Sequence, residues 1–433
     1  MFLIYNEKQK QPLIGDGIEQ RKTLAYLFYH FPRYTETYAY REVLQLDKLG
    51  VNMALFALRR DPPGPVPNEA VQLLEKTHYL QLVPFIRKVM HHAAMLMRHP
   101  FRYFGVLFKQ MLWSGEVPLW FWRNWHTFWV GVILARKLQQ KGLNHLHIHH
   151  AQKAASVGYV ASQIARIPFS IMLYGKDLLS LKRDSRHAIR HARWVFCFHE
   201  THKETLFDLV PGLGKEQVRV LHPGVDVNVF QPVSGKKESL FQFRLVTVTQ
   251  LEPNRGLEDL LKTYKILDSR DIDFEAIIIG EGPERRRLQD QANRLRLNHR
   301  VRFTGARRME EIIESMGRAD LFVLPLPKTR ENDYEGIPMA LLEAMAMGIP
   351  VITTEIEGIR DVVDESTGRV LKEPTPIELA DVVEELLLKE TLRDKLGRRA
   401  RRRIEKQYHL QETSLQLVQM LGVEYEELKK SRY

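Results

Sequence analysis

Compact apolar runs alternate with amphipathic stretches along most of the first half of the chain. Runs of this length predict buried strands, and apolar positions three and four apart predict helices. Strands are predicted over residues 23–32, 51–58, 143–151, 168–175, 192–198 and 218–224. Helices are predicted from an N-cap at Thr35 or Thr37 to Gly50, and over residues 154–167. Such alternation indicates a parallel α/β sheet.

The same alternation begins again after residues 225–242, a stretch without periodicity that contains Pro, Ser, Gly and Lys. We interpret it as a linker between domains. Strands are then predicted over residues 244–251, 274–283, 301–305, 320–326 and 349–355, and helices over 256–270, 285–297, 309–319 and 338–348. The fold class predicted is α/β, with two Rossmann-like domains facing a cleft, where open sheets of this kind bind ligands.

Residues 76–142 interrupt the alternation and predict several helices inserted in the first domain. From Lys76 to Lys176 there are thirteen Lys or Arg and one acid, Glu116, a balance of +12 in a chain whose net charge is +11. Five of the six tryptophans lie there as well. Cations beside aromatic residues attract an anionic membrane surface. The alternative is a solvated helical subdomain with an aromatic core, and we expect no nucleic-acid partner.

Features of the sequence also indicate the cellular compartment. The single cysteine, Cys197, excludes a disulfide within the chain and fits a reducing environment. The start "MFLIYNEKQKQP" lacks the basic region and cleavage site of a signal peptide. No apolar run approaches the roughly 20 residues of a membrane span. We therefore expect a cytoplasmic protein, with any membrane contact peripheral and at the inner face.

The stretch "YEGIPMALLEAMAMG" holds two carboxylates eight positions apart, Glu335 and Glu343. Pro338 suits the first position of a helix and Gly348 its end. Glu335 then precedes the helix, beside free backbone amides that favour an anion. Glu343 falls in the second turn among Ala and Met, so it needs a partner, and a ribose diol would serve. The alternative is that both glutamates are solvated.

These pieces, taken in order, resemble the retaining GT-B glycosyltransferases of family 4 (group 1). "HFPRYTETYAYREVLQLDKLG" is similar to the opening of that family, usually FP-x-x-SETF, and "HLHIHHA", "IPFSIMLYGKDL" and "VLHPGVDVNVFQP" to its later landmarks. "IIIGEGPERRRLQ", "VRFTG" and "ADLFVLPL" follow, and "EGIPMALLEAMAMGIPVI" contains its E-x7-E motif. The resemblance covers nearly the whole chain outside the basic helical segment.

The resemblance implies transfer of a sugar, with retention, from a nucleoside-diphosphate sugar to a saccharide or lipid-linked acceptor. Surface-polysaccharide or glycolipid biosynthesis would be typical. Glu335 would contact the donor sugar and Glu343 the ribose. The backbone at Gly336, Ile337, Pro338 and Met339 would lie against the sugar or the diphosphate. The resemblance implies no covalent nucleophile. It implies a front-face mechanism, in which the departing phosphate takes the acceptor's proton.

The residues expected to bind the diphosphate of the donor differ from the family pattern. Relatives carry an Arg and a Lys in a pattern like G-R-L-x-x-x-K-G, whereas this chain has "TQLEPNRG". Arg255 can replace the Lys, but Gln250 stands where the Arg is expected and brings no charge. Gly280 and Gly282 follow a predicted strand in "GEGP", an incomplete dinucleotide fingerprint. We expect them to form a turn near the diphosphate.

A second departure lies in the first domain. Tyr174 in "LYGKD" stands where a His that supports the reacting sugar is common, and Asp177 is retained. Two hypotheses stay open. The chain is an active transferase in which Arg255 and a further cation such as Lys328 compensate, or it is a non-catalytic homologue that binds nucleotide sugar or a partner subunit.

We expect no metal and no other cofactor. The sequence "DID" at 271–273 resembles a metal motif of the other large glycosyltransferase fold, but it lies between a helix and a strand without a supporting motif. His145, His147 and His149 share one face of a predicted strand, and imidazoles suit zinc. No Cys, Asp or Glu adjoins them in the sequence.

The sequence thus predicts three parts. Residues 1–225 form an acceptor-binding domain, with the basic Trp-rich helical region at about 76–142. Residues 226–404 form a nucleotide-sugar-binding domain. Residues 405–433 are helices that cross back to the first domain, as the resemblance implies.

Overall fold

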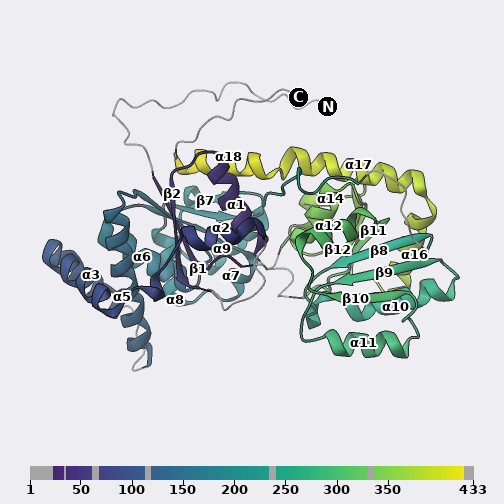
Figure 1. Ribbon diagram of the computed structural model, residues 1–433, viewed down its shortest axis with the longest axis horizontal. Coiled ribbons are helices and arrows are strands. Elements are labelled where there is room, and N and C mark those ends of the chain that lie inside the picture. The colour runs from purple at the N-terminus through teal and green to yellow at the C-terminus, as the bar shows by residue number, and fades with distance from the viewer. Residues whose placement is uncertain are drawn as a thin grey trace, which may run out of the picture.

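The computed structural model describes residues 23–33, 36–60, 68–112, 119–233, 240–329 and 336–423. Within these ranges, two parallel β-sheets with helices on both faces form two domains side by side (Figure 1). The predicted fold class is therefore confirmed.

The first sheet has the strand order β3-β2-β1-β4-β5-β6-β7, and all of its strand pairs are parallel. Its strands are β1 (Leu24–His30), β2 (Met53–Arg59), β3 (Thr77–Tyr79), β4 (His145–His149), β5 (Phe169–Met172), β6 (Trp194–Cys197) and β7 (Val218–Val220). Because helices cover both faces, β1 begins with an apolar run rather than an alternating pattern, and its first five residues are buried.

Helices of the first domain divide between the two faces of its sheet. They are α1 (Thr37–Lys48), α2 (Val71–Lys76), α3 (Phe85–Arg98), α4 (Pro100–Leu112), α5 (Leu119–Gln140), α6 (Lys153–Ala165), α7 (Gly175–Leu179), α8 (Arg183–His191) and α9 (Glu200–Leu209). Residues of α1 and α2 share a buried cluster with one face, and residues of α5, α6 and α8 with the other. The predicted series of helices after Lys76 is confirmed by α3, α4 and α5.

Two local predictions need correction. The N-cap of α1 is Glu36, and Thr37 is the first helical residue, while Thr35 lies outside the described residues. Strand β3 was not predicted, because three residues are too few to show a periodicity.

The second sheet has the order β10-β9-β8-β11-β12-β13 and is also parallel. Its strands are β8 (Phe243–Val248), β9 (Phe274–Ile279), β10 (Val301–Gly305), β11 (Leu321–Leu324), β12 (Val351–Thr354) and β13 (Gly368–Leu371). Its helices are α10 (Leu257–Ser269), α11 (Arg285–Arg294), α12 (Met309–Gly317), α14 (Met339–Ala346), α15 (Ile359–Val362), α16 (Pro376–Leu388) and α17 (Glu390–Gln407).

The chain returns to the first domain at its C-terminal side. Helix α17 contributes Ala400 and Ile404 to the core of the second domain, whereas α18 (Leu410–Leu421) contributes Leu417 and Val418 to the cluster around β1. Figure 1 shows both helices along one side of the molecule, spanning the two domains. None of the helices in the described ranges combines the length and the hydropathy that a bilayer crossing requires.

Candidate functional site at the domain boundary

Loops at the carboxyl end of the second sheet pack backbone against backbone. Gly280 has a φ of 147°, and a Cβ there would overlap the carbonyl oxygen of Thr249. A Cβ at Gly282 would overlap the carbonyl of Leu251. The turn after β9 thus lies directly on the loop after β8, and glycine is required for this approach. The structure gives both glycines a packing role, and their predicted contact with a donor stays a prediction.

The two predicted diphosphate ligands differ in exposure. Gln250 is exposed in the loop after β8. Arg255 is buried, and its Nη2 lies 3.4 Å from the carboxylate of Glu252. The predicted contact of Arg255 with the diphosphate stays a prediction. Lys328, in the loop after β11, is exposed at the same end of the sheet.

Helix α14 lies where a helix was predicted, but it begins at Met339 rather than at Pro338 and ends at Ala346. Pro338 is its N-cap and Gly348, with a φ of 72°, follows its last turn. The preceding Gly336 has a φ of 74°, and the side chain of Ile337 is buried. Glu335 lies outside the described residues. The predicted helix is therefore confirmed, and the sugar contact of Glu335 stays a prediction.

The first domain touches this loop through a histidine. A Cβ at Gly336 would lie 3.1 Å from Nε2 of His199, and a Cβ at Gly358 would lie 3.0 Å from the same atom. The backbone N–H of His202 donates to Nδ1 of His199 at 3.3 Å. Burial, together with His202 and His222, lowers the pKa of His199 to about 3. The neutral ring therefore carries its proton on Nε2, which has no hydrogen-bond acceptor among the described residues.

Glu343 also meets the first domain. Its carboxylate is buried and lies 3.2 Å from Nη1 of Arg41 on α1. Arg41 is buried too; its Nε lies 3.3 Å from Glu69 and its guanidinium stands over the ring of Phe230. The partner that a buried Glu343 requires is thus supplied by the protein.

The electrostatics of this pair follow from its burial. Burial raises the pKa of Glu343 to about 7, although Arg41 acts in the opposite direction. Burial would lower the pKa of Arg41, but Glu343, Tyr40 and Glu69 raise it, so Arg41 stays charged. Nη2 of Arg41 has no hydrogen-bond partner among the described residues. An additional acceptor would therefore be stabilised beside this ion pair.

Tyr174 and Asp177 come together at the start of α7. The backbone N–H of Tyr174 donates to Oδ2 of Asp177 at 3.0 Å, and the Tyr174 hydroxyl lies 2.6 Å from Nδ1 of His149. Both residues are buried. Tyr174 is therefore held by its own partner rather than left pointing into solvent.

His150 joins this group, and the sequence analysis did not single it out. Its Nδ1 lies 3.2 Å from Asp177, and its Nε2 lies 3.5 Å from Glu36. Burial alone would lower the pKa of His150, but Asp177 and Glu36 raise it to about 10. Oδ1 of Asp177 has no partner among the described residues. The result is a cationic imidazole beside a buried carboxylate.

Helix α1 links the two halves of the candidate site. Its N-cap, Glu36, contacts His150, Arg41 contacts Glu343 in the other domain, and Glu42 contacts His149 at 3.2 Å. No sequence motif placed these residues together, because each partner lies more than a hundred positions away.

The face shared by the histidines of β4 is confirmed. His145 and His147 both contact the hydroxyl of Ser170, at 2.9 and 2.7 Å. The structure adds a carboxylate that sequence proximity did not show, since ligand atoms of Glu42, His147 and His149 lie within 4.8 Å of one another. Glu42 and His149 already hydrogen-bond to each other, which is sufficient to explain their burial.

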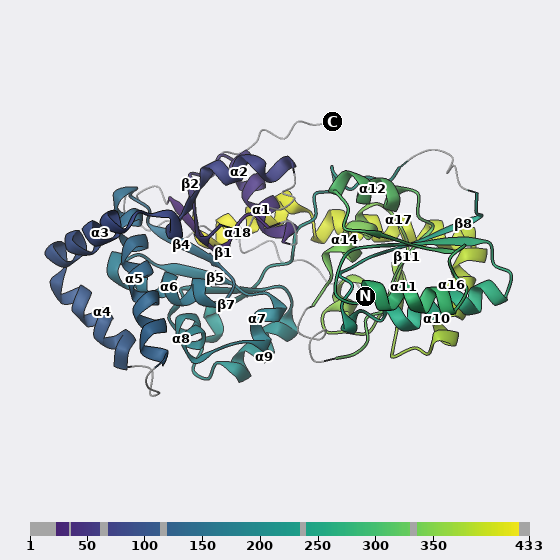
Figure 2. The same cartoon turned by 60° about the horizontal axis from the view of Figure 1, so that its bottom comes forward.

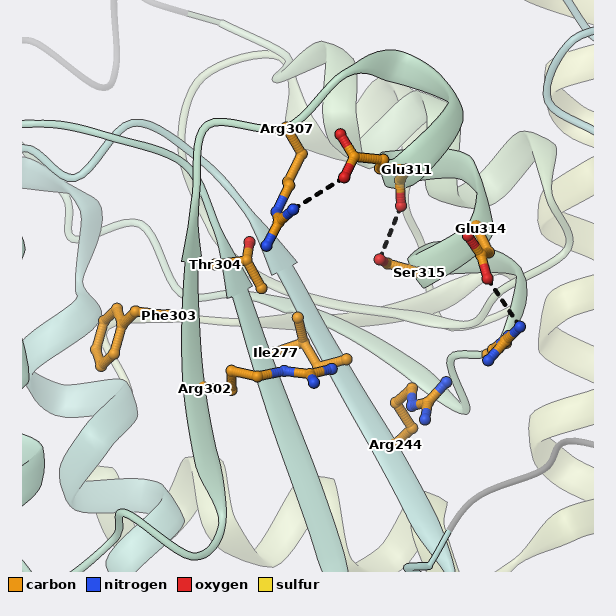
Figure 3. Close-up of a pocket in the computed structure, with 10 residues that line it drawn as sticks. Arg244, Ile277, Arg302, Phe303, Thr304, Arg307, Glu311, Glu314 and Ser315 are labelled. Atoms are coloured by element: carbon orange, nitrogen blue, oxygen red, sulfur yellow. Dashed lines mark hydrogen bonds and ion pairs between the residues drawn. The ribbon is translucent and has the colours of Figure 1, made fainter.

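A separate hollow of about 310 Å³ lies between β10 and α12 (Figure 3). Its lining includes Glu311, Glu314 and four arginines, which are Arg244, Arg302, Arg307 and Arg318. Arg307 pairs with Glu311 and Arg318 with Glu314. The hollow shares no residue with the groups described above.

The comparisons with known proteins give these groups a family context. Residues 234–403 match the family model of glycosyl transferases group 1. These residues are similar to that family, and they make up less than half of the chain. They include both the loop packing around Gly280 and the whole of α14.

Curated glycosyltransferases are similar to parts of the chain. The chain is 30% identical over 214 residues to a putative colanic acid biosynthesis glycosyltransferase, WcaL, of Escherichia coli, covering 48% of this chain and 52% of that protein. It is 31% identical over 158 residues to the amylovoran biosynthesis glycosyltransferase AmsK of Erwinia amylovora, covering 36% of this chain and 38% of that protein. The chain thus spans about half or less of the length of these relatives.

Solved structures support the fold. Anabaena Alr3699/HepE, in complex with UDP and glucose, superposes with a TM-score of 0.68 at 16% identity, over 93% of this chain and all of that one. The lipopolysaccharide outer core galactosyltransferase WaaB superposes with a TM-score of 0.61 at 14% identity, over 93% of this chain. The two facing parallel-sheet domains are the GT-B fold.

Proposed function

We propose that this chain is a retaining glycosyltransferase of family 4. It moves a sugar from a nucleoside-diphosphate sugar to a saccharide or lipid-linked acceptor, in surface-polysaccharide or glycolipid biosynthesis. The observation that carries the proposal is the position of α14, which lies inside the residues that match the group 1 family model and meets Arg41 of the other domain through Glu343, while His199 lies against Gly336 in the loop before it. The UDP and glucose named for the superposed Anabaena protein support a nucleotide-sugar donor.

In this proposal the second domain holds the donor. Glu335 accepts from hydroxyls of the sugar, and Glu343 accepts from the ribose. The backbone from Gly336 to Met339 contacts the sugar or the diphosphate. Because these groups orient the donor rather than attack it, no covalent nucleophile on the protein is needed.

The first domain holds the acceptor, and Tyr174 and Asp177 lie on its side of the boundary. The bond from the sugar's anomeric carbon to the diphosphate oxygen breaks, and a bond to the acceptor oxygen forms on the same face. The departing phosphate oxygen takes the acceptor's proton. Stabilising that leaving-group charge is the main work of the protein, and we propose that no metal takes part.

We also propose a place for this reaction, at the inner face of a membrane. The nucleotide sugar comes from the cytoplasm, and a lipid-linked acceptor would bring the chain to the bilayer as a peripheral protein. The helices that carry this part of the proposal are α3 and α4.

A second candidate function is a non-catalytic homologue that binds nucleotide sugar or a partner subunit. Two observations favour it. Gln250 brings no charge to a position where a cation is expected, and Arg255 is buried against Glu252. A diphosphate leaving group would then lack the cations that usually stabilise it.

A panel of UDP, GDP and ADP with their common sugars tests the proposal, first by thermal shift and then by donor hydrolysis and transfer. A ligand that binds the folded state raises its melting temperature. We expect one nucleotide family to do so and its sugar to be consumed. Binding without turnover would favour the second candidate. Neither binding nor turnover would contradict the proposed transferase and would leave, of the second candidate, only the form that binds a partner subunit.

A further inference from the structure

Helices α3 and α4 form a projection, here called the α3–α4 arm (residues 85–112). The arm lies at the end of the first domain that faces away from the second domain (Figures 1 and 2). It is anchored through one side only. His92 contacts the hydroxyl of Tyr103 at 2.9 Å and the carbonyl oxygen of Trp129 at 3.1 Å, while Met95 and Val106 are buried in the core. The arm is therefore a firmly packed element.

The outer side of the arm is apolar. Eight of the fourteen exposed large hydrophobic residues in the described ranges belong to it: Phe85, Ile86, Val89, Met90, Met97, Phe101, Phe104 and Phe108. Phe101 is 93% exposed and Met97 is 78% exposed. Phe101, Phe104 and Phe108 follow helical spacing, so they form a stripe along α4. A helix face in water is normally polar, and an apolar stripe of this size marks an interaction surface.

The arm also carries cations and no acidic residue. The sequence has no Asp or Glu between Glu75 and Glu116, whereas the arm itself holds Arg87, Lys88, Arg98, Arg102 and Lys109. None of these five cations pairs with a carboxylate in the described part of the chain. The positive field is strong enough that, besides burial, Arg102 and Arg98 lower the pKa of His99.

We propose that the α3–α4 arm docks on an anionic lipid bilayer. Phe101, Phe104 and Met97 enter the interface, while Arg87, Arg98 and Lys109 lie among the lipid phosphates. The positive charge of the arm distinguishes lipid from two other possible partners of this surface, a second copy of the chain and a nucleic acid. A second copy of the arm would bring like charges together, and a nucleic acid would leave the apolar stripe exposed. Lipid phosphates over acyl chains match both properties.

The reason for docking depends on the proposed function, because a lipid-linked acceptor would be presented at a bilayer. The evidence for docking itself is the apolar and basic surface of the α3–α4 arm and does not depend on that function. Because the arm points away from the second domain, docking leaves α14 and its loops uncovered by lipid (Figure 2).

Co-sedimentation of the full chain with vesicles tests the proposal. Vesicles of phosphatidylcholine with phosphatidylglycerol are compared with vesicles of phosphatidylcholine alone. The apolar variant is Phe101→Ser with Phe104→Ser, and the basic variant is Arg87→Gln with Arg98→Gln and Lys109→Gln. Matched controls lie on the other domain: Ile377→Ser with Leu388→Ser, which are similarly exposed, and Arg398→Gln with Arg399→Gln and Arg402→Gln.

We expect the unchanged chain to bind the anionic vesicles and not the neutral ones. The basic variant should lose about a hundredfold in partitioning at low salt, because each cation near an anionic surface contributes about fivefold. The apolar variant should lose at least about tenfold. Both controls should bind like the unchanged chain. All substituted side chains are exposed, so unchanged melting temperatures will show that the variants fold.

Several results would overturn docking on lipid. These are no binding to anionic vesicles, equal binding to neutral ones, or an equal loss in the controls. Self-association abolished by the apolar variant would assign the surface to a second copy, and RNA binding in preference to vesicles would assign it to nucleic acid. Donor thermal shifts are measured on the same samples. If vesicles bind as expected and no nucleotide binds, the proposed function fails and the docking stands.

Discussion

Arg41 on α1 and Glu343 on α14 form a buried ion pair, with 3.2 Å between Nη1 and the carboxylate, and the pair joins the two domains. One member of the pair, Glu343, is the residue that the family resemblance expects to contact the donor ribose. If Glu343 contacts the donor, as the resemblance implies, the pair would couple donor binding to the contact between the domains.

Removing one partner of a buried pair leaves a charge without compensation. Arg41→Ala should therefore lower the free energy of unfolding by about 3 kcal/mol at pH 8, measured by urea denaturation. The matched control is Arg318→Ala, which breaks an exposed pair with Glu314 and should cost less than about 1 kcal/mol. Equal losses for the two variants would show that the buried pair between the domains stabilises the fold no more than an exposed pair does.

The same pair gives the chain a dependence on pH. The pKa of Glu343 rises from its ordinary 4.5 to about 7 in the folded chain. Between these values the folded chain holds a proton that the unfolded chain has released, so stability falls as pH rises from 4.5 through 7. Melting temperatures across this range should fall more steeply for the unchanged chain than for Glu343→Gln. Parallel curves would contradict the assignment.

The hydroxyl of Tyr174 holds His149 inside the first domain. Tyr174→Phe keeps the ring but leaves Nδ1 of His149 buried without its partner. We expect a loss of about 1–3 kcal/mol in the free energy of unfolding. Tyr103→Phe is a matched control at a less buried tyrosine that contacts His92, and it should cost less. A Tyr174→Phe chain as stable as the unchanged protein would mean that this contact contributes little.

Gln250 and Tyr174 separate the two candidate functions. For an active transferase with compensating cations, Gln250→Arg and Tyr174→His should leave sugar transfer unchanged or lower it. For a non-catalytic homologue, the same pair of changes should raise transfer from near zero by a large factor. Turnover of the unchanged and doubly changed chains, with donor binding measured beside it, distinguishes these results.

Sequence patterns predicted the elements that are repeated and local. Helix α14 between Pro338 and Gly348, and the histidine face of β4, follow from spacing within a few residues. The restart of the strand–helix alternation after residue 242 predicted the second sheet for the same reason.

The contacts between distant residues could not be predicted in this way. Arg41 and Glu343 are 302 positions apart, and Glu42 and His149 are 107 apart. Only the fold brings such residues together, because a single sequence carries no record of which helix faces which. The apolar stripe on α4 was likewise ambiguous, since Phe101 and Phe104 have the same spacing whether they face the core or the solvent.

The role of Glu343 in donor binding can be measured by comparing the unchanged chain with Glu343→Gln. Thermal shifts of the unchanged chain and of Glu343→Gln are measured against the nucleoside diphosphates and their sugars, with Glu314→Gln, an exposed glutamate of the same domain, as control. We expect one nucleotide to raise the melting temperature of the unchanged chain and of the control. Glu343→Gln should need at least about tenfold more ligand for the same shift. A shift of equal size in all three chains, or no shift with any nucleotide, would contradict this role of Glu343.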